Sequence, residues 1–271
     1  MKGAVNLVDV SGFAYRAFYA FPSLAHNETE VGALYGFCAT MIGLVSRFPD
    51  SMFIAACDSG KRTFRNDIYS GYKANRPKTP DSLLAQLPLI KEACRRFGFD
   101  TIEVPGVEAD DIIATYATNQ CSYYSINIIS SDKDLMQLIG DNVTMYDPAK
   151  RRYITEQDIV KKFGVTHDKI LDALALMGDS SDNIPGVAGI GPKTAAAWIN
   201  EFGSVENLIE NIAKLPLNSK RRLLESGAAN AVLSKKLATL MRDLELPFEY
   251  TVAAPRKLAE FFSQYGFRSL L

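Results

Sequence analysis

Three short, largely apolar runs constrain the fold of this chain most. They cover residues 4–8, 52–57 and 126–129, and none alternates between apolar and polar positions as a half-exposed strand does. Helix-like segments such as 32–47 and 82–97 lie between them. Strands that are apolar on both faces are typical of parallel sheets covered by helices. We therefore predict an α/β fold with a mostly parallel central sheet flanked by helices.

The strand-like runs disappear beyond about residue 160, and helical patterns continue from there to the C-terminus. Pro192 is well placed as the first residue of a helix, Gly203 as its stop, and Ser204 as the cap of the next helix. We expect an α/β domain over residues 1–165 and a helical region over 166–271.

Aspartates follow the three apolar runs at the point where each predicted strand ends. Asp9 follows the first run, Asp58 the second, and Asp132 with Asp134 the third. Because the carboxyl ends of parallel strands line one crevice, these acids are expected to converge. A single aspartate at such a position is usually a helix cap or a turn residue, but nine acids at positions expected to converge indicate a common site. The candidate metal-site acids are Asp9, Asp58, Glu108, Asp110, Asp111, Asp132, Asp134, Asp179 and Asp182.

A cluster of carboxylates needs positive charge to be stable. Two carboxylates about 5 Å apart repel by roughly 3 kcal/mol at an effective dielectric near 20. The chain has only two histidines, so all-oxygen ligation by Mg²⁺ or Mn²⁺ is favoured over a zinc site. Two such ions can stabilise the attacking and leaving oxygens of a phosphodiester, which makes phosphoryl hydrolysis the natural reaction class.

The charge of the chain is unevenly distributed although its formal net value is only −1. Residues 61–78 are basic and are interleaved with Phe64, Tyr69 and Tyr72, whereas residues 103–134 are acidic. The basic stretch suits phosphate contact and base stacking, and its alternative reading is a solvated loop with core aromatics. The four cysteines have no CxxC spacing, and no apolar run predicts a signal peptide or a membrane span, so we expect a cytoplasmic protein.

A glycine-rich segment joins two predicted helices around residues 183–203. Gly186 and Gly191 have the separation of a phosphate-binding loop, but Pro192 breaks that pattern and no buried strand precedes it. A hairpin between two helices fits better, because the amides around Gly189 and Gly191 can hold a DNA phosphate. A turn without a ligand is the alternative.

Five motifs, taken in order, resemble the 5′-nuclease family and most closely the 5′-3′ exonuclease domain of bacterial DNA polymerase I. They are LVDVSG, FRNDIYSGYKANRP, GVEADD, SDKD and GDSSDNIPGVAGIGPKTA. The resemblance covers almost the whole chain and implies a PIN-like nuclease core, a helical arch around residues 61–90 and a helix-hairpin-helix motif around 183–203. It also implies two Mg²⁺ ions, for which Mn²⁺ can substitute, and K⁺ at the hairpin.

The resemblance assigns roles to single residues. The nine acids match the metal-site acids of the family, and Lys73, Arg76 and Arg16 match cations that act on or near the scissile phosphate. Two departures are Val10, where the family usually has glycine, and an SSDKD segment one residue shorter than usual. The expected DNA contacts are Tyr72, Lys61, Arg65, Gly189, Gly191, Lys193 and Thr194.

The implied function is a monomeric 5′-3′ exonuclease and flap endonuclease of DNA replication and repair. Its substrates would be DNA 5′ ends, flaps and nicks, including RNA-primed strands, and its product would carry a 5′ phosphate. Because the sequence stops at Leu271, a separate DNA polymerase is the expected partner. Two alternatives stay open, a structure-specific DNA-binding protein without catalysis and a ribonuclease of related α/β architecture.

Overall fold

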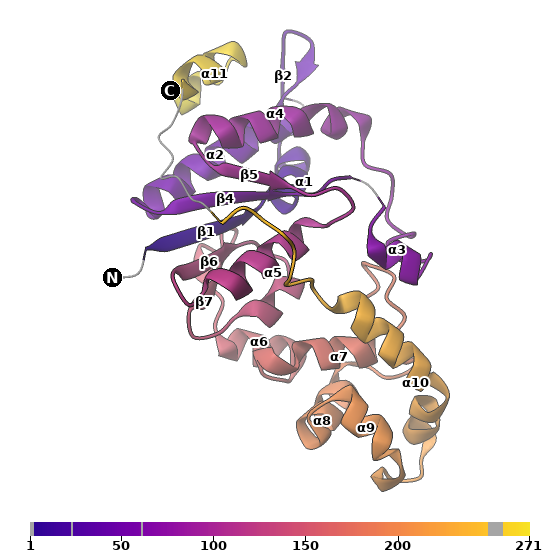
Figure 1. The fold of residues 1–271 in the computed structure, drawn as a ribbon. Helices are drawn as coiled ribbons and strands as arrows, with labels where there is room; N and C mark the ends of the chain where they lie inside the picture. The colour runs from indigo at the N-terminus through magenta and orange to yellow at the C-terminus, as the bar shows by residue number, and fades with distance from the viewer. Residues whose placement is uncertain (1–2, 23, 61, 249–256) are drawn as a thin grey trace.

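A six-stranded sheet with the order β5-β4-β1-β6-β7-β8 forms the centre of the α/β part (Figure 1). Neighbouring strands are parallel, except that β7 and β8 are antiparallel. The strands are β1 (Ala4–Asp9), β4 (Met52–Cys57), β5 (Asp100–Glu103), β6 (Ser125–Ile129), β7 (Val143–Asp147) and β8 (Arg152–Tyr153). The computed structural model describes residues 3–22, 24–60, 62–248 and 257–271.

The three strands predicted from the sequence are β1, β4 and β6, and they lie side by side in the sheet. Asp9 pairs in register with Ala56 on β4, and Val8 pairs with Ile129 on β6, so the three strands end at one edge. The prediction of buried, parallel strands is therefore confirmed. A small hairpin of β2 (Ala25–His26) and β3 (Thr29–Glu30), which the sequence did not reveal, projects beyond the helices.

Helices cover both faces of the sheet and complete two apolar clusters. Alternate residues of each strand face opposite layers; Val8 and Ala55 belong to the cluster under α1, α2 and α4, whereas Leu7 and Ile54 belong to the cluster with α5. Val10, the residue that departs from the family pattern, is buried in the first cluster. The helices of these layers are α1 (Val10–Ala20), α2 (Gly32–Arg47), α4 (Asp81–Phe97) and α5 (Ala109–Gln120).

A helical region follows β8, and no strand lies beyond Tyr153 in the part of the chain that is described. Pro192 begins α8, Gly203 ends it, and the Ser204 hydroxyl caps α9 by accepting from the Asn207 N–H, as predicted. The elements of this region are α6 (Glu156–Phe163), α7 (Ile170–Met177), α8 (Pro192–Phe202), α9 (Val205–Glu210), α10 (Ser219–Ala238) and α11 (Leu258–Gln264). Short 3₁₀ turns are η1 (Asp134–Leu138), η2 (His167–Lys169), η3 (Ile212–Lys214) and η4 (Arg268–Leu270).

Two expected boundaries differ from the structure. Among the described residues of the arch expected over 61–90, one short helix, α3 (Phe64–Ile68), belongs to the arch alone. The chain from Asp81 onward forms α4 and buries Leu83 and Ile90 in the core. In addition, α11 does not stay with the helical region but packs its phenylalanines in the cluster under α4. None of the helices in the described residues has the length and apolar character that crossing a bilayer requires.

Candidate active site

The carboxyl edge of the sheet brings acids from distant segments together. Asp9, the last residue of β1, accepts from the Gly12 N–H at 3.0 Å and from the Ser130 hydroxyl at 2.9 Å, which ties it to the end of β6. Asp58 follows β4 and accepts from the Ala109 N–H at 2.8 Å, which ties it to the start of α5. The ends of β1, β4 and β6 and the first turn of α5 therefore meet.

A first acid group consists of Asp9, Asp58, Asp110 and Asp132. Burial raises the pKa of Asp9 to about 6, and the nearby charges of Asp58 and Asp132 act in the same direction. Burial also raises the pKa of Asp110 well above its ordinary value, and the other three acids add to this shift. The four carboxylates therefore repel one another, and a bound cation would relieve this repulsion.

A second acid group consists of Asp134, Asp179 and Asp182, on η1 and on the loop after α7. Burial raises the pKa of Asp134 to about 7, and the charges of Asp132, Asp179 and Asp182 contribute. Asp132 thus links the two groups. Asp179 forms an ion pair with Lys133 at 2.6 Å.

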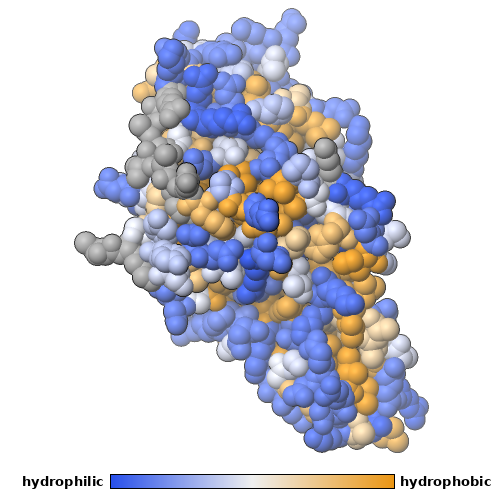
Figure 2. Space-filling view, in the orientation of Figure 1, coloured by the Kyte–Doolittle hydropathy of each residue, from blue (hydrophilic) through white to orange (hydrophobic). Residues whose placement is uncertain are grey.

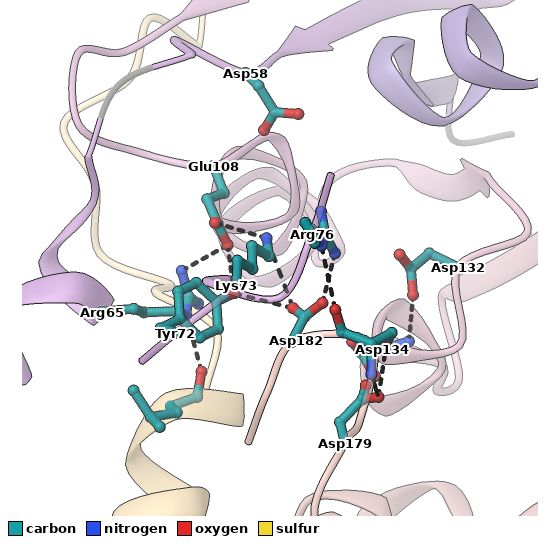
Figure 3. Close-up of polar contacts among 12 residues, drawn as sticks. Asp58, Arg65, Tyr72, Lys73, Arg76, Glu108, Asp132, Asp134, Asp179 and Asp182 are labelled. Carbon is teal, nitrogen blue, oxygen red and sulfur yellow. Dashed lines mark hydrogen bonds and ion pairs between the residues drawn. The ribbon is translucent and has the colours of Figure 1, made fainter. Parts of the chain in front are cut away.

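Lys73 and Arg76, in the segment before α4, point toward Glu108 and Asp182, as Figure 3 shows. The Lys73 ammonium lies 2.7 Å from Glu108 Oε1 and 3.6 Å from Asp182 Oδ2, and Arg76 Nη2 lies 2.5 Å from Asp182 Oδ1. The backbone supports this arrangement, because the Lys73 N–H donates to the Asp182 carbonyl at 2.9 Å and the Asn183 side chain donates to the Gly71 carbonyl at 2.7 Å. The segment is docked on the second acid group.

Two of the predicted DNA contacts, Tyr72 and Arg65, are buried in the structure. Tyr72 is only 4% exposed, and its hydroxyl lies 3.0 Å from Glu108 Oε2 and 3.1 Å from Asp182 Oδ2, so the side chain is packed in the interior of the protein. Arg65 is 1% exposed and its donors are used inside the protein. The burial of Tyr72 agrees with the alternative interpretation of the basic stretch, in which its aromatic residues belong to the core. Lys61, the third predicted contact of this segment, lies outside the described residues.

Asp111 also departs from the expected set of metal-site acids. Its side chain is fully buried, and Arg65 contacts both carboxylate oxygens at 2.7 Å. Its Oδ1 additionally accepts from the Met241 N–H at 2.9 Å. Asp111 lies one position beyond Asp110 on α5, which turns it about 100° around the helix, away from the first acid group and into the core. The carboxylate is thus occupied by a structural ion pair.

Of the remaining predicted residues, Thr194 is partly exposed, and the exposed ones are Arg16, Gly189, Gly191 and Lys193. Arg16 on α1 donates to Ser131 at 2.7 Å and lines a pocket with Asp9 and Asp132. Gly189 has a φ of +81°, which favours glycine, and Gly191 is the N-cap of α8. A second pocket is lined by Lys193 and Thr194 of α8 together with Lys220 of α10.

The acids supply the oxygen ligands that a divalent cation needs, but their side chains are not spaced to coordinate one. Within the described ranges, no three acidic, histidine or cysteine side chains are grouped closely enough to hold an ion as they stand. However, Asp134 Oδ1 is buried without any hydrogen-bond partner. A buried carboxylate oxygen without a partner is costly, and the first acid group is self-repelling. Both features fit a hard cation bound by oxygen ligands.

A parallel sheet that gathers carboxylates at its carboxyl edge, with basic side chains facing them, defines a class of metal-dependent phosphodiester hydrolase. The family model "5′-3′ exonuclease, N-terminal resolvase-like domain" matches residues 4–164, and the model "5′-3′ exonuclease, C-terminal SAM fold" matches residues 165–260. The chain belongs to the 5′-3′ exonuclease family. The nuclease family and the α/β fold predicted from the motifs are thereby confirmed.

Individual relatives agree with this assignment. The chain is 39% identical over 243 residues to a 5′-3′ exonuclease of Aquifex aeolicus, covering 89% of this chain and 82% of the relative. It is 40% identical over 279 residues to DNA polymerase I of Rhizobium leguminosarum, covering 97% of this chain but 28% of the relative, so it spans less than a third of that polymerase. A solved structure of T5 5′-exonuclease with bound zinc superimposes with a TM-score of 0.75 at 25% identity, covering 87% of this chain and 89% of the other.

Proposed function

We propose that this protein is a Mg²⁺-dependent 5′-3′ exonuclease and 5′ flap endonuclease that leaves a 5′ phosphate on its DNA product. The observation that carries the proposal is the self-repelling acid group around Asp110, together with the partnerless Asp134 Oδ1. Mn²⁺ is the expected substitute for Mg²⁺, because both accept all-oxygen ligation. The similar T5 5′-exonuclease was solved with divalent metal ions bound, which supports the metal dependence of this proposal.

Two ion positions follow from the two acid groups. Asp9, Asp58, Asp110 and Asp132 would hold one ion, and Asp134 with its neighbours Asp179 and Asp182 would hold the other. When bound, such ions lower the pKa of a water molecule and neutralise the charge that develops on the phosphate. Glu108 stands at the rim, where Lys73 contacts one of its oxygens.

Lys73 and Arg76 would contact the scissile phosphate. Burial alone would lower the pKa of Lys73, but Glu108 and Asp182 raise it above its ordinary value, so the ammonium keeps its charge at neutral pH. Asp182 holds both cations now, and a phosphate at the site would compete with this carboxylate for them. Arg16, which shares a pocket with Asp9, would contact the neighbouring phosphate.

The hairpin before α8 would hold the duplex part of the substrate. The exposed amides near Gly189 and Gly191, followed by Lys193 and Thr194 on the first turn of α8, suit phosphate oxygens. K⁺ at this hairpin would assist that contact. We infer that the substrates are flaps, nicks and RNA-primed strands in replication and repair. The protein would act as a monomer beside a DNA polymerase, in the cytoplasm at the nucleoid.

One assay tests the proposal against both alternatives. The protein is incubated with a 5′-labelled DNA flap, a nicked duplex and an RNA-tipped strand, each with Mg²⁺ or with a chelator. We expect cleavage of the DNA substrates only with Mg²⁺. Cleavage of RNA alone would indicate a ribonuclease of related architecture, and tight binding without cleavage would indicate a DNA-binding protein that lacks catalysis.

A further inference from the structure

The guanidinium of Arg65 has partners on each of its nitrogens, although nothing in the chemistry proposed above uses it. Its Nε donates to the Leu237 carbonyl at 2.8 Å, and Nη2 donates to the Thr239 carbonyl at 3.0 Å. The other bonds go to two carboxylates, Asp111 at 2.7 Å through both Nη atoms and Glu108 at 3.1 Å through Nη1. These bonds use the full fork of a guanidinium, which a lysine ammonium could not reproduce.

The partners of Arg65 belong to three parts of the molecule. Arg65 itself lies on α3, Glu108 and Asp111 lie at the start of α5, and Leu237 and Thr239 lie at the end of α10. Figure 3 shows the Arg65 side chain pointing toward Glu108. The residue therefore joins the basic segment, the first turn of the helix that carries Asp110, and the end of the long helix of the C-terminal region. The Arg65 side chain is buried and makes all of these contacts inside the protein.

Glu108 connects Arg65 to the proposed active site, because its carboxylate contacts both Arg65 and Lys73. One oxygen of its carboxylate accepts from Lys73 at 2.7 Å, and the other accepts from Arg65 at 3.1 Å and from Tyr72 at 3.0 Å. Asp111 stands behind Arg65, with both oxygens bonded to it and no exposed surface. Glu108 is therefore in contact with both Arg65 and Lys73.

We propose that Arg65 and Asp111 form a positioning pair, in which Asp111 is the counter-ion of Arg65 and not a ligand of the catalytic ions. The pair holds Glu108 and, through it, Lys73 at the rim of the acid groups. The proposal rests on the proposed nuclease function, because Lys73 has a role only if a phosphate is cleaved. It reassigns two residues, one expected to bind DNA and the other expected to bind metal.

The design of the test follows from burial. Removing Arg65 alone would leave the Asp111 charge buried without a partner, which destabilises a protein strongly. The double variant Arg65→Met with Asp111→Asn removes both charges, keeps similar volumes and keeps an oxygen for the Met241 N–H. A matched control is Lys235→Met with Asp172→Asn, which removes another partly buried pair, 2.6 Å apart, in the helical region. Arg65→Lys keeps the positive charge but loses the paired hydrogen bonds that the two Nη atoms donate to Asp111.

Three quantities are measured on each variant: the unfolding temperature, the affinity for a 5′-flap DNA in chelator, and the single-turnover cleavage rate at saturating DNA with Mg²⁺. We expect the double variant to bind the flap within twofold of the wild type and to cleave it at least tenfold more slowly. Arg65→Lys should cleave at an intermediate rate. The control pair should lose stability but cleave within twofold of the wild type.

Mn²⁺ binding, followed by electron paramagnetic resonance without DNA, separates a positioning role from ligation. The double variant should bind Mn²⁺ within twofold of the wild type, whereas Asp110→Asn should bind it at least tenfold more weakly. If the double variant loses Mn²⁺ as Asp110→Asn does, Asp111 is an ion ligand and the inference is wrong.

Two cleavage results would also overturn the inference. If the wild type cleaves but the double variant cleaves equally fast, the pair has no positioning role. If the double variant does not fold, Arg65→Lys decides, and a rate within twofold of the wild type contradicts the inference. A wild type that cleaves nothing overturns the proposed function itself, which is a distinguishable outcome.

Discussion

Arg76 and Asp182 are joined by an ion pair, with 2.5 Å between Nη2 and Oδ1, although they lie 106 residues apart in the sequence. The pair places a cation inside the second acid group, next to Lys73. The first acid group, around Asp110, is dominated by like charges instead. The two acid groups should therefore respond differently when single residues are changed.

Neutralising Asp110 should stabilise the metal-free protein while it abolishes cleavage. Burial and three neighbouring carboxylates disfavour its charge, so Asp110→Asn removes a repulsion from the folded state. We expect the unfolding temperature in chelator to rise by a few degrees, since about 1 kcal/mol corresponds to roughly 2–4 °C at this size. Flap cleavage with Mg²⁺ should fall by about 100-fold or more. A variant that is less stable than the wild type in chelator would contradict the account of this group.

The effect of Mg²⁺ on stability should grow with pH. Burial raises the pKa of Asp9 to about 6 and that of Asp134 to about 7, above their ordinary value of 3.8. The folded protein therefore binds more protons than the unfolded chain between about pH 4 and pH 7, and its free energy of unfolding falls as the pH rises through this window. Mg²⁺ must displace these protons.

Thermal unfolding with Mg²⁺ and with chelator, at several values between about pH 5 and pH 8, checks this prediction. The difference between the two unfolding temperatures should be small at the acid end and several degrees larger at the alkaline end. An equal difference across the whole range would show that the ion does not bind where these carboxylates release their protons.

Removing the cations of the basic segment should slow cleavage without abolishing DNA binding. Arg76→Ala and Lys73→Ala each take away a positive charge that faces the proposed phosphate position, and we expect about 100-fold slower single-turnover cleavage for each. Lys78→Ala is the matched control, because Lys78 lies on the same segment but pairs with Asp81 at 2.8 Å at the surface. Equal rates for the control and for Arg76→Ala would rule out a direct role.

The salt dependence of flap binding tests whether Lys193 in the hairpin contacts a DNA phosphate. Lys193 is exposed on the first turn of α8, so Lys193→Ala should weaken flap binding and lower the slope of log affinity against log salt by about one phosphate contact. Lys257→Ala, an exposed lysine paired with Glu260 beside α11, should leave the slope unchanged. A slope for Lys193→Ala that equals the wild-type slope would exclude this contact.

The sequence predicted the central strands and the acids at their ends because parallel strands carry a clear signal. Runs that are apolar on both faces mark β1, β4 and β6, and the position directly after such a run is fixed by the sheet. Strands β5 and β7 were missed because they mix polar and apolar residues; Asp100–Glu103, for example, has an acid at each end.

The three predicted site residues whose side chains the structure buries share a physical cause. Tyr72 and Arg65 lie in a basic, aromatic stretch whose composition suits both DNA contact and a buried polar network, and only the tertiary partners decide between these. Asp111 follows Asp110 directly, so composition cannot tell which of the two faces the acid groups. Long-range partners such as the end of α10, which accepts from Arg65, leave no local signal in the sequence.

Mn²⁺ binding and flap cleavage, measured together on the wild type and on Asp134→Asn, test the central claim most directly. Asp134 carries a buried oxygen that has no hydrogen-bond partner, so its carboxylate should be a ligand of a divalent ion. We predict that the wild type binds Mn²⁺ and cleaves the flap, and that Asp134→Asn binds Mn²⁺ at least tenfold more weakly and cleaves about 100-fold more slowly while still binding DNA. Wild-type Mn²⁺ affinity and wild-type cleavage in the variant would contradict the account.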